Sequence, residues 1–255
     1  MPATRDGKPL VAIIALKRET FPDLAAVVDM LAQAYPDEGS PAEATRGMDS
    51  AVFRWGGGPV AVALKSEPIA EADLAEACAA AWWWEQAAEQ LARHKAHLLV
   101  SLAPSAEDAV ARHLRLSRVV AVLLSQCDAA GVYWPGGGIV HEPQAFAEQA
   151  ADLSPENLHP ALWIDMHISP NDDESWSLYT VGLSAFDRAE IEIPSTTHDP
   201  PEVYELCADV IRYLLASGEK LEDGGVISRS DEEQVEVRYG PSMFDEEQTV
   251  MQLEF

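Results

Sequence analysis

Hydrophobic and polar positions fall into blocks that predict an alternation of strands and helices. "PLVAIIAL", residues 9–16, is a continuous apolar run typical of a buried strand, and residues 21–35 place apolar side chains at helical spacing. "AVFRW" and "PVAVALK" flank three glycines, which predicts a hairpin with a glycine turn. Residues 66–92, rich in alanine and glutamate, predict one long helix before the apolar strand 96–102.

This order, β-α-β-β-α-β, predicts an α+β fold built on a ferredoxin-like unit. The pattern then recurs: "FRWGGGPVAV" is echoed by "VYWPGGGIVH", and "HKAHLLVSLAP" by "HPALWIDMHISP". We interpret the echo as a duplication, with internal units 9–104 and 96–255 inside a single compact domain, 1–255. The sheets are expected to be mainly antiparallel.

Residues 176–255 predict paired strands around one amphipathic helix. "WSLYTVGLSAF" and "AEIEIPS" read as two strands, and "PPEVYELCADVIRYLLAS" as a helix that ends at a glycine. In "AEIEI" the alternation points Glu190 and Glu192 outward and the two isoleucines inward. "DGGVISRS", "EQVEVRY" and "QTVMQLEF" predict short closing strands.

Three consecutive tryptophans, Trp82 to Trp84, stand inside the predicted 66–92 helix. Successive helical residues step by about 100°, so the three indoles point in three directions. Trp83 shares a face with the alanines one turn away on either side, and its two neighbours diverge from that face. We expect the chain itself to cover all three as part of a core. An uncovered Trp82 or Trp84 would instead be an interface candidate.

The net charge of the chain narrows the classes of partner that it can bind. The formal net charge is −26, and residues 141–255 hold 26 acidic but only five basic side chains. A field of that sign repels phosphate backbones and argues against nucleic acid as a ligand. It attracts a basic protein partner and speeds its association. The alternative interpretation is that the charge serves solubility alone.

The sequence also indicates a compartment. No stretch approaches the roughly 18 apolar residues of a membrane span, and the N-terminus lacks the pattern of a signal peptide. The three cysteines, Cys78, Cys127 and Cys207, are odd in number and far apart, which favours a reducing environment. We therefore expect a cytoplasmic protein that does not contact membranes.

The motifs that usually carry catalysis or cofactor binding are missing from the sequence. It has no phosphate-binding loop, dinucleotide fingerprint, H-E-x-x-H, C-x-x-C or G-x-S-x-G. The two triple-glycine runs precede apolar strands and not helices, so they predict hairpin turns. His94 and His97 are three apart, but two histidines do not complete a zinc site. A helix that ends near Arg93 is the preferred interpretation, with no metal and no cofactor expected.

Asp165 and His167 lie two positions apart on one face of a predicted strand. They could form an acid–base pair for catalysis, or a structural polar pair at a sheet edge. We prefer the polar pair, because no nucleophile or oxyanion-binding signal accompanies it. With His97, Tyr133 and His141 they form the rival hypothesis. That hypothesis is an enzyme or a small-ligand or metal-binding protein with a pocket between the two units.

Several segments together resemble a known bacterial family. These segments are "HKAHLLVS", "GVYWPGGGIVHEPQAF", "ALWIDMHIS", "YTVGLSAFDRAEIEI" and "LEDGGVI", spread from about Val11 to the C-terminus. They are similar to DUF4261, a domain of unknown function. The resemblance implies one compact family domain. It implies no activity, substrate or cofactor.

Our leading hypothesis is a non-catalytic, acidic protein that binds a basic protein partner. An immunity-type or adaptor protein that captures a toxin or secreted effector is one concrete form. Aromatic side chains dominate interface hot spots, which makes tryptophans the candidate anchors. The interface candidates are Trp82, Trp84, Trp134, Trp163 and Trp176. A third hypothesis, a structural or oligomeric component, rests on "AEIEI" and "QLEF" as exposed sheet edges.

Overall fold

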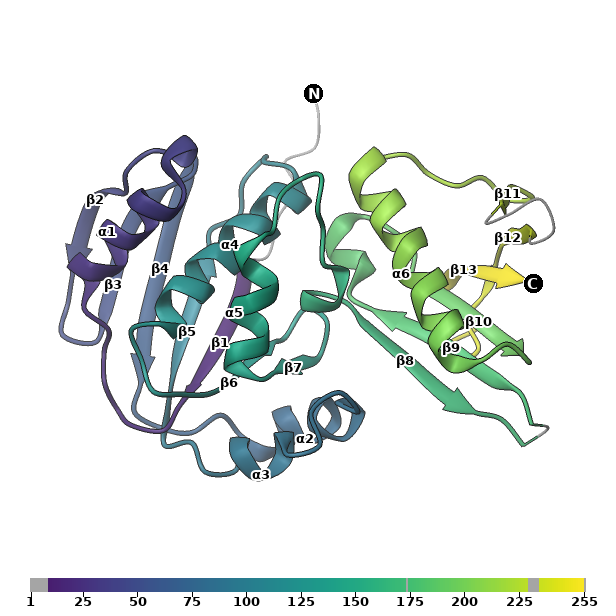
Figure 1. The fold of residues 1–255 in the computed structure, drawn as a ribbon, viewed down its shortest axis with the longest axis horizontal. Helices are drawn as coiled ribbons and strands as arrows, with labels where there is room; N and C mark the ends of the chain where they lie inside the picture. Colours follow the sequence, from purple (N-terminus) through teal and green to yellow (C-terminus); the bar gives the residue numbers. More distant parts are fainter. Residues whose placement is uncertain (1–8, 173, 229–233, 255) are drawn as a thin grey trace. The chain divides into compact units, whose positions relative to one another are not determined.

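The structure is a computed structural model that describes residues 9–172, 174–228 and 234–254. It divides the chain into two compact units, Met1–Asn157 and Leu158–Phe255. Helices and mainly antiparallel strand pairs make up both units, which confirms the predicted α+β class (Figure 1). No described helix is long and apolar enough to cross a membrane.

The N-terminal unit is built on one sheet whose strands run in the order β2-β3-β4-β5-β1-β6-β7. The strands are β1 Leu10–Leu16, β2 Ala42–Arg46, β3 Ser50–Trp55, β4 Gly58–Lys65, β5 Ala96–Leu102, β6 Ala129–Trp134 and β7 Ile139–His141. The helices are α1 Leu24–Ala34, α2 Glu71–Ala80, α3 Ala87–Leu91, α4 Ala109–Leu124 and α5 Pro143–Ala151.

Helices cover both faces of this sheet. On one face, Trp134 of β6 contacts His113 of α4 and Phe146 of α5, with ring centroids 5.8 Å and 6.4 Å apart. Residues alternate between the faces along a strand, so Gly131 lies on the opposite face. There α2 and α3 pack against β1, β6 and β7 (Figure 1).

The boundary between the two units differs from the predicted one. The sequence suggested that the strand 96–102 joins two repeated units, whereas β5 is a central strand between β4 and β1. A duplicated ferredoxin-like unit is not confirmed, because the C-terminal unit has a different strand order. The echoed glycine runs do share a role, since both form the predicted hairpin turns, between β3 and β4 and between β6 and β7.

The C-terminal unit places one long helix, α6 Pro200–Ser217, on a six-stranded sheet in the order β11-β12-β13-β10-β9-β8 (Figure 1). The strands are β8 Asp165–Pro170, β9 Trp176–Val181, β10 Ile191–Thr196, β11 Val226–Ser228, β12 Gln234–Pro241 and β13 Thr249–Glu254. The segments "AEIEI" and "QLEF" fall on or beside β10 and β13. Both strands are flanked on each side, so neither is the exposed edge that the sequence suggested.

The two glutamates predicted to point into solvent have structural roles instead. Glu192 is buried, and its carboxylate accepts hydrogen bonds from Ser242 Oγ at 2.5 Å and from the Met243 amide at 2.8 Å. Glu190 accepts from Thr180 Oγ1 at 2.8 Å and from the backbone amides of residues 182, 183 and 184. Each carboxylate thereby satisfies donors of a neighbouring loop, a contribution that alternation along the strand does not reveal.

Candidate functional site

The three tryptophans lie in a turn and not on a helix. The predicted 66–92 helix divides into α2, which ends at Ala80, and α3, which begins at Ala87. Tight turns join them: the Trp84 amide donates to Ala81 O at 2.9 Å, and the Ala87 amide to Trp84 O at 2.9 Å. Helix propensity is a weak preference that tertiary packing overrides. The prediction that the three indoles point in directions about 100° apart around one helix is therefore wrong.

Trp84 is the indole that enters the core. It is 4% exposed and packs in a cluster with Ala15 of β1, Leu74 of α2 and Leu91 of α3. It also lies over Gly131 of β6, where an added Cβ would be 3.0 Å from Trp84 Cη2 and 2.7 Å from Leu91 Cδ2. Gly131 therefore leaves the space that admits the indole.

Gly131→Ala should overpack this contact and lower the free energy of unfolding by about 1–3 kcal/mol. Amide hydrogen exchange in β1 and β6 measures the loss within this unit. Gly136→Ala is the matched control, because its Cβ would meet nothing closer than Trp134 Nε1 at 3.8 Å. The control should stay within about 0.5 kcal/mol of the parent. Equal stability of the two variants would contradict the packing described here.

Trp82 and Trp83 remain at the surface, 65% and 37% exposed. Their rings meet edge to face, with centroids 5.7 Å apart and planes at 82°. Trp83 Nε1 donates a hydrogen bond to Val140 O on β7 at 3.3 Å, which ties the pair to the sheet. With Trp84 anchored below, the exposed pair is held in one orientation. We call Trp82 and Trp83 the aromatic pair.

Acidic residues flank the aromatic pair in the sequence. The α2–α3 segment carries Glu71, Asp73, Glu76, Glu85 and Glu89, and no lysine or arginine occurs between Ser66 and Ala92. Burial raises the pKa of Tyr133 on the adjacent β6, and the negative charges of Asp73 and Glu76 raise it further. The local field at this surface is therefore negative, although the N-terminal part of the chain is the less acidic one.

The other interface candidates differ in exposure. Trp84, Trp134 and Trp163 are buried, which removes them as exposed anchors. Each packs within its own unit. Trp134 contacts α4 and α5, and the Trp163 ring centroid lies 5.9 Å from that of Phe186. Trp176 on β9 is half-buried.

The five predicted ligand-binding residues divide between the two units. In the N-terminal unit, His97 Nδ1 lies 2.9 Å from Glu67 O, and Tyr133 packs beside α2. His141 is on the other face of the sheet, with its ring 5.4 Å from that of Phe146. Tyr133 and His141 therefore do not line one pocket, because neighbouring strands place them on opposite faces.

In the C-terminal unit, Asp165 and His167 share a face of β8, as predicted. The His167 ring lies against Tyr179, with centroids 4.9 Å apart, and Asp165 is buried. Within the described residues, no group of three or more His, Cys, Asp or Glu side chains is arranged to hold a metal ion.

His94 belongs to a helix end, as the sequence indicated. The Ile69 amide donates to His94 Nε2 at 2.6 Å, so Nδ1 carries the proton that is donated to Leu91 O. Two backbone groups at the margin of the α2–α3 segment are satisfied by this one ring. His94 therefore positions the segment and has no ring nitrogen left to coordinate a metal.

The cysteines have environments that suppress their nucleophilicity. Burial, aided by the charge of Asp128, raises the pKa of Cys127 to about 12. Burial also raises the pKa of Cys207, which α6 places in the core of the C-terminal unit. Both thiols stay protonated near neutral pH, and a thiol attacks far less readily than a thiolate.

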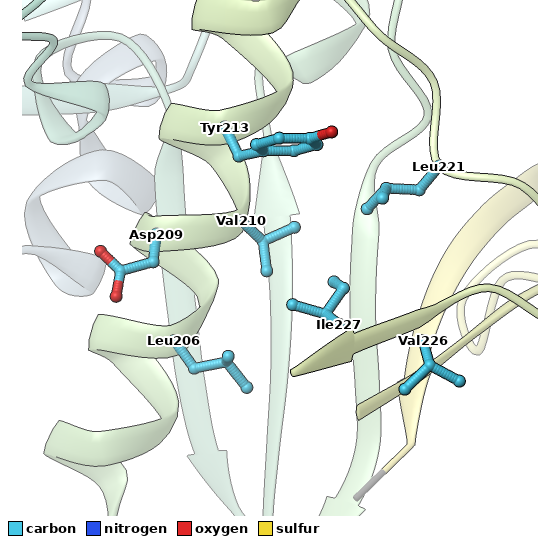
Figure 2. A pocket seen from close by; sticks show the side chains of 7 residues that line it. All are labelled: Leu206, Asp209, Val210, Tyr213, Leu221, Val226 and Ile227. Carbon is cyan, nitrogen blue, oxygen red and sulfur yellow. The ribbon is translucent and has the colours of Figure 1, made fainter. Parts of the chain in front are cut away.

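A groove in the C-terminal unit was not foreseen from the sequence. It lies between α6 and the segment 221–227, has a volume of about 460 Å³, and is drawn in Figure 2. Its lining residues are Leu206, Asp209, Val210, Tyr213, Leu221, Val226 and Ile227. We call it the α6–β11 groove. The helix and the short strand were both predicted from the sequence, but not that they face each other across a groove.

Comparison with known proteins gives one result. Residues 179–254 match the family model described as a domain of unknown function, DUF4261. This segment of the chain is similar to DUF4261. The resemblance noted in the sequence is thereby confirmed for this segment, which is less than a third of the chain. No curated protein and no solved structure gave a significant match.

The DUF4261 segment contains the features that organise the C-terminal unit. Glu190 and Glu192, with the loops that they hold, lie within it, and so does every residue that lines the α6–β11 groove. The aromatic pair lies outside it. The segment that matches DUF4261 and the aromatic pair therefore belong to different compact units of the chain.

Proposed function

We propose that this protein is a non-catalytic interaction protein that binds a basic protein partner through the aromatic pair. The observation that carries the proposal is the exposure of Trp82, 65%, beside a hydrogen-bonded Trp83 in an acidic setting. An exposed indole that packs against a second aromatic ring offers apolar area that a partner can bury. An interaction that buries Trp82 gives this arrangement a role.

The chemistry favours a cationic side chain on the partner. Arginine and lysine bind over the face of an indole, by about 0.5–2 kcal/mol depending on how far the contact excludes water. The carboxylates of α2 and α3 strengthen the same preference, because they attract the cation before contact. The pair is also pre-oriented, so little conformational entropy is lost on binding.

The whole-chain charge supports the same class of partner. A net charge of −26 raises the association rate of a basic protein and lowers that of nucleic acid. An immunity-type or adaptor role, in which the partner is a basic toxin or effector, fits this charge. We place the interaction in the cytoplasm, because Cys78, Cys127 and Cys207 are all free thiols.

We further propose that the core of the N-terminal unit is ferredoxin-like. The strand order β4-β5-β1-β6, with α1 and α4 as crossovers, supports this assignment. The α2–α3 segment is then an insertion between β4 and β5. It packs on the face opposite the crossover helices, which leaves its turn, and the aromatic pair, at the surface.

Trp82→Ala should weaken partner binding by about tenfold to thirtyfold, or about 1.4–2 kcal/mol, as expected for an interface hot spot. The partner is first captured from the native host on the immobilised full chain and identified by mass spectrometry. Its dissociation constant and association rate are then measured by surface plasmon resonance with purified proteins.

Met48→Ala serves as the matched control, since Met48 is an exposed apolar residue in the same unit. The control should bind like the parent, and the association rate should fall as salt is added. The proposal fails if the partner is acidic, if association ignores salt, or if Trp82→Ala binds as tightly as the parent.

A further inference from the structure

We propose a second binding site, the α6–β11 groove, which takes a peptide segment of a partner that carries an apolar side chain flanked by basic residues. The site lies in the C-terminal unit, and the proposal is independent of the aromatic pair. It rests on the shape of the groove, on the charges along its walls and on the strand at its edge.

The groove has the size and lining of a site for an apolar side chain. Its volume of about 460 Å³ falls within the range of about 300–1,000 Å³ that is typical of ligand sites. Val210 on α6 and Leu221 and Ile227 on the opposite side form the apolar lining, with Leu206 below (Figure 2). Tyr213 and Val226 lie at the margins, 48% and 55% exposed. Two large apolar residues at the mouth of an apolar groove indicate a surface that a partner covers.

Hydrogen bonds hold the walls of the groove in place. Tyr213 Oη donates to Glu219 Oε2 at 2.6 Å, which connects α6 to the start of the facing segment. Tyr239 Oη donates to Leu221 O at 3.0 Å, and the Val237 amide donates to Gly225 O at 2.8 Å. The facing segment is thus tied to β12, and the groove is formed before any peptide arrives.

Acidic residues in the groove and on the two elements beside it favour a basic segment. Glu202, Glu205 and Asp209 follow each other at three- and four-residue spacing along α6 and are all exposed. This spacing places them in one stripe of the helix. Glu222 and Asp223 lie on the facing segment and are exposed as well. Arg212 forms an ion pair with Asp209, and His198 Nδ1 lies 3.8 Å from Glu202 Oε2. The attraction for a basic ligand therefore comes mainly from Glu205 on the helix and from Glu222 and Asp223 on the facing segment.

The edge of the sheet favours an extended peptide over a compact small molecule. Among the described strands, β11 is the last on its side of the sheet. Ile227 pairs with Val235 of β12, and residues alternate in the direction of their backbone groups. Val226 therefore directs its amide and carbonyl away from β12, where an added strand can pair with them. Peptides recognised in this way gain affinity from the backbone and specificity from pockets for alternate side chains.

The test titrates the full chain, labelled with ¹⁵N, with an acetylated peptide of alternating lysine and leucine. Its counterpart of alternating glutamate and leucine is titrated in parallel. We expect the lysine peptide to shift the amide signals of Val210, Tyr213 and Ile227 in a saturable manner, and the glutamate peptide to leave them unchanged. Equal shifts from both peptides, or shifts that spread over acidic surfaces and spare these amides, would overturn the proposal.

Two variants separate the groove from general charge attraction. Val226→Arg places a cation at the mouth on an exposed position, and should weaken binding of the lysine peptide at least about fivefold. Tyr213→Ala removes a wall of the groove and should have an effect of the same direction. Trp82→Ala should leave the shifts of Val210, Tyr213 and Ile227 unchanged, even where it alters shifts near the aromatic pair, which keeps this proposal separate from the one on that pair. The proposal is contradicted if neither Val226→Arg nor Tyr213→Ala changes the affinity for the lysine peptide.

Discussion

Trp84→Ala is expected to destabilise the N-terminal unit by about 3–5 kcal/mol, the range found when a buried tryptophan is truncated. The indole is the largest side chain in the cluster beneath α2 and α3, and its removal leaves a cavity over Gly131. Amide hydrogen exchange in β1, β5 and β6 measures the loss within this unit, which avoids treating a chain of two units as two-state.

Trp82→Ala is the matched control for this experiment, two positions away in the same triplet. Its side chain is mostly exposed, so the change in stability should stay within about 0.5 kcal/mol. The two variants therefore separate the roles that the structure gives to adjacent tryptophans. Comparable losses in both would show that the triplet packs as a helix with all its indoles covered.

Arg115→Ala is expected to cost about 3 kcal/mol, because it removes a buried arginine and leaves the partly exposed Glu107 carboxylate without its ion-pair partner. Arg115 is 3% exposed and binds the Glu107 carboxylate with both terminal nitrogens, Nη1 at 3.1 Å and Nη2 at 2.6 Å. Nη1 also donates to Gly56 O in the β3–β4 turn. The same hydrogen-exchange measurement, extended to β3 and β4, reports the loss.

The double variant Arg115→Met with Glu107→Leu tests the physical reason. Replacing both charges by apolar side chains removes the cost of an unpaired carboxylate, so at least half of the lost stability should return. If the double variant is as unstable as Arg115→Ala, the loss comes from packing of the arginine stem and not from the broken pair.

The glycine runs show how far local pattern carries a prediction. The three glycines before β4 indicated a hairpin turn, and the turn is there, with positive φ at Gly56 and Gly57. The sequence did not show why glycine is needed in this turn, because the side chain that crowds it, Arg115, lies 59 positions away. A Cβ on Gly56 would lie 2.9 Å from Arg115 Cδ, and one on Gly58 3.3 Å from its Nη2. The turn is glycine-rich because an arginine passes beneath it.

The candidate site was predicted with less success than the fold. Most strands and helices were visible from periodicity, including α6 and the closing strands. The ligand pocket, by contrast, required His141 and Tyr133 to converge, and the sheet places them on opposite faces. The α6–β11 groove went unseen because local periodicity predicts the helix and the strand but not how the two pack against each other.

By itself, the sequence determined the α+β class, the hairpin turns, the acidic charge and the DUF4261 resemblance. These depend on local periodicity, on composition and on residue order. Only the tertiary structure decided which tryptophan is buried and which is exposed. Alanine and glutamate favour a continuous helix through Trp82, Trp83 and Trp84. The space above Gly131 and the carbonyl of Val140 instead hold Trp84 and Trp83 where a continuous helix would not place them. Packing between distant segments outweighed a local preference of a few tenths of a kcal/mol per residue, and so left Trp82 in solvent.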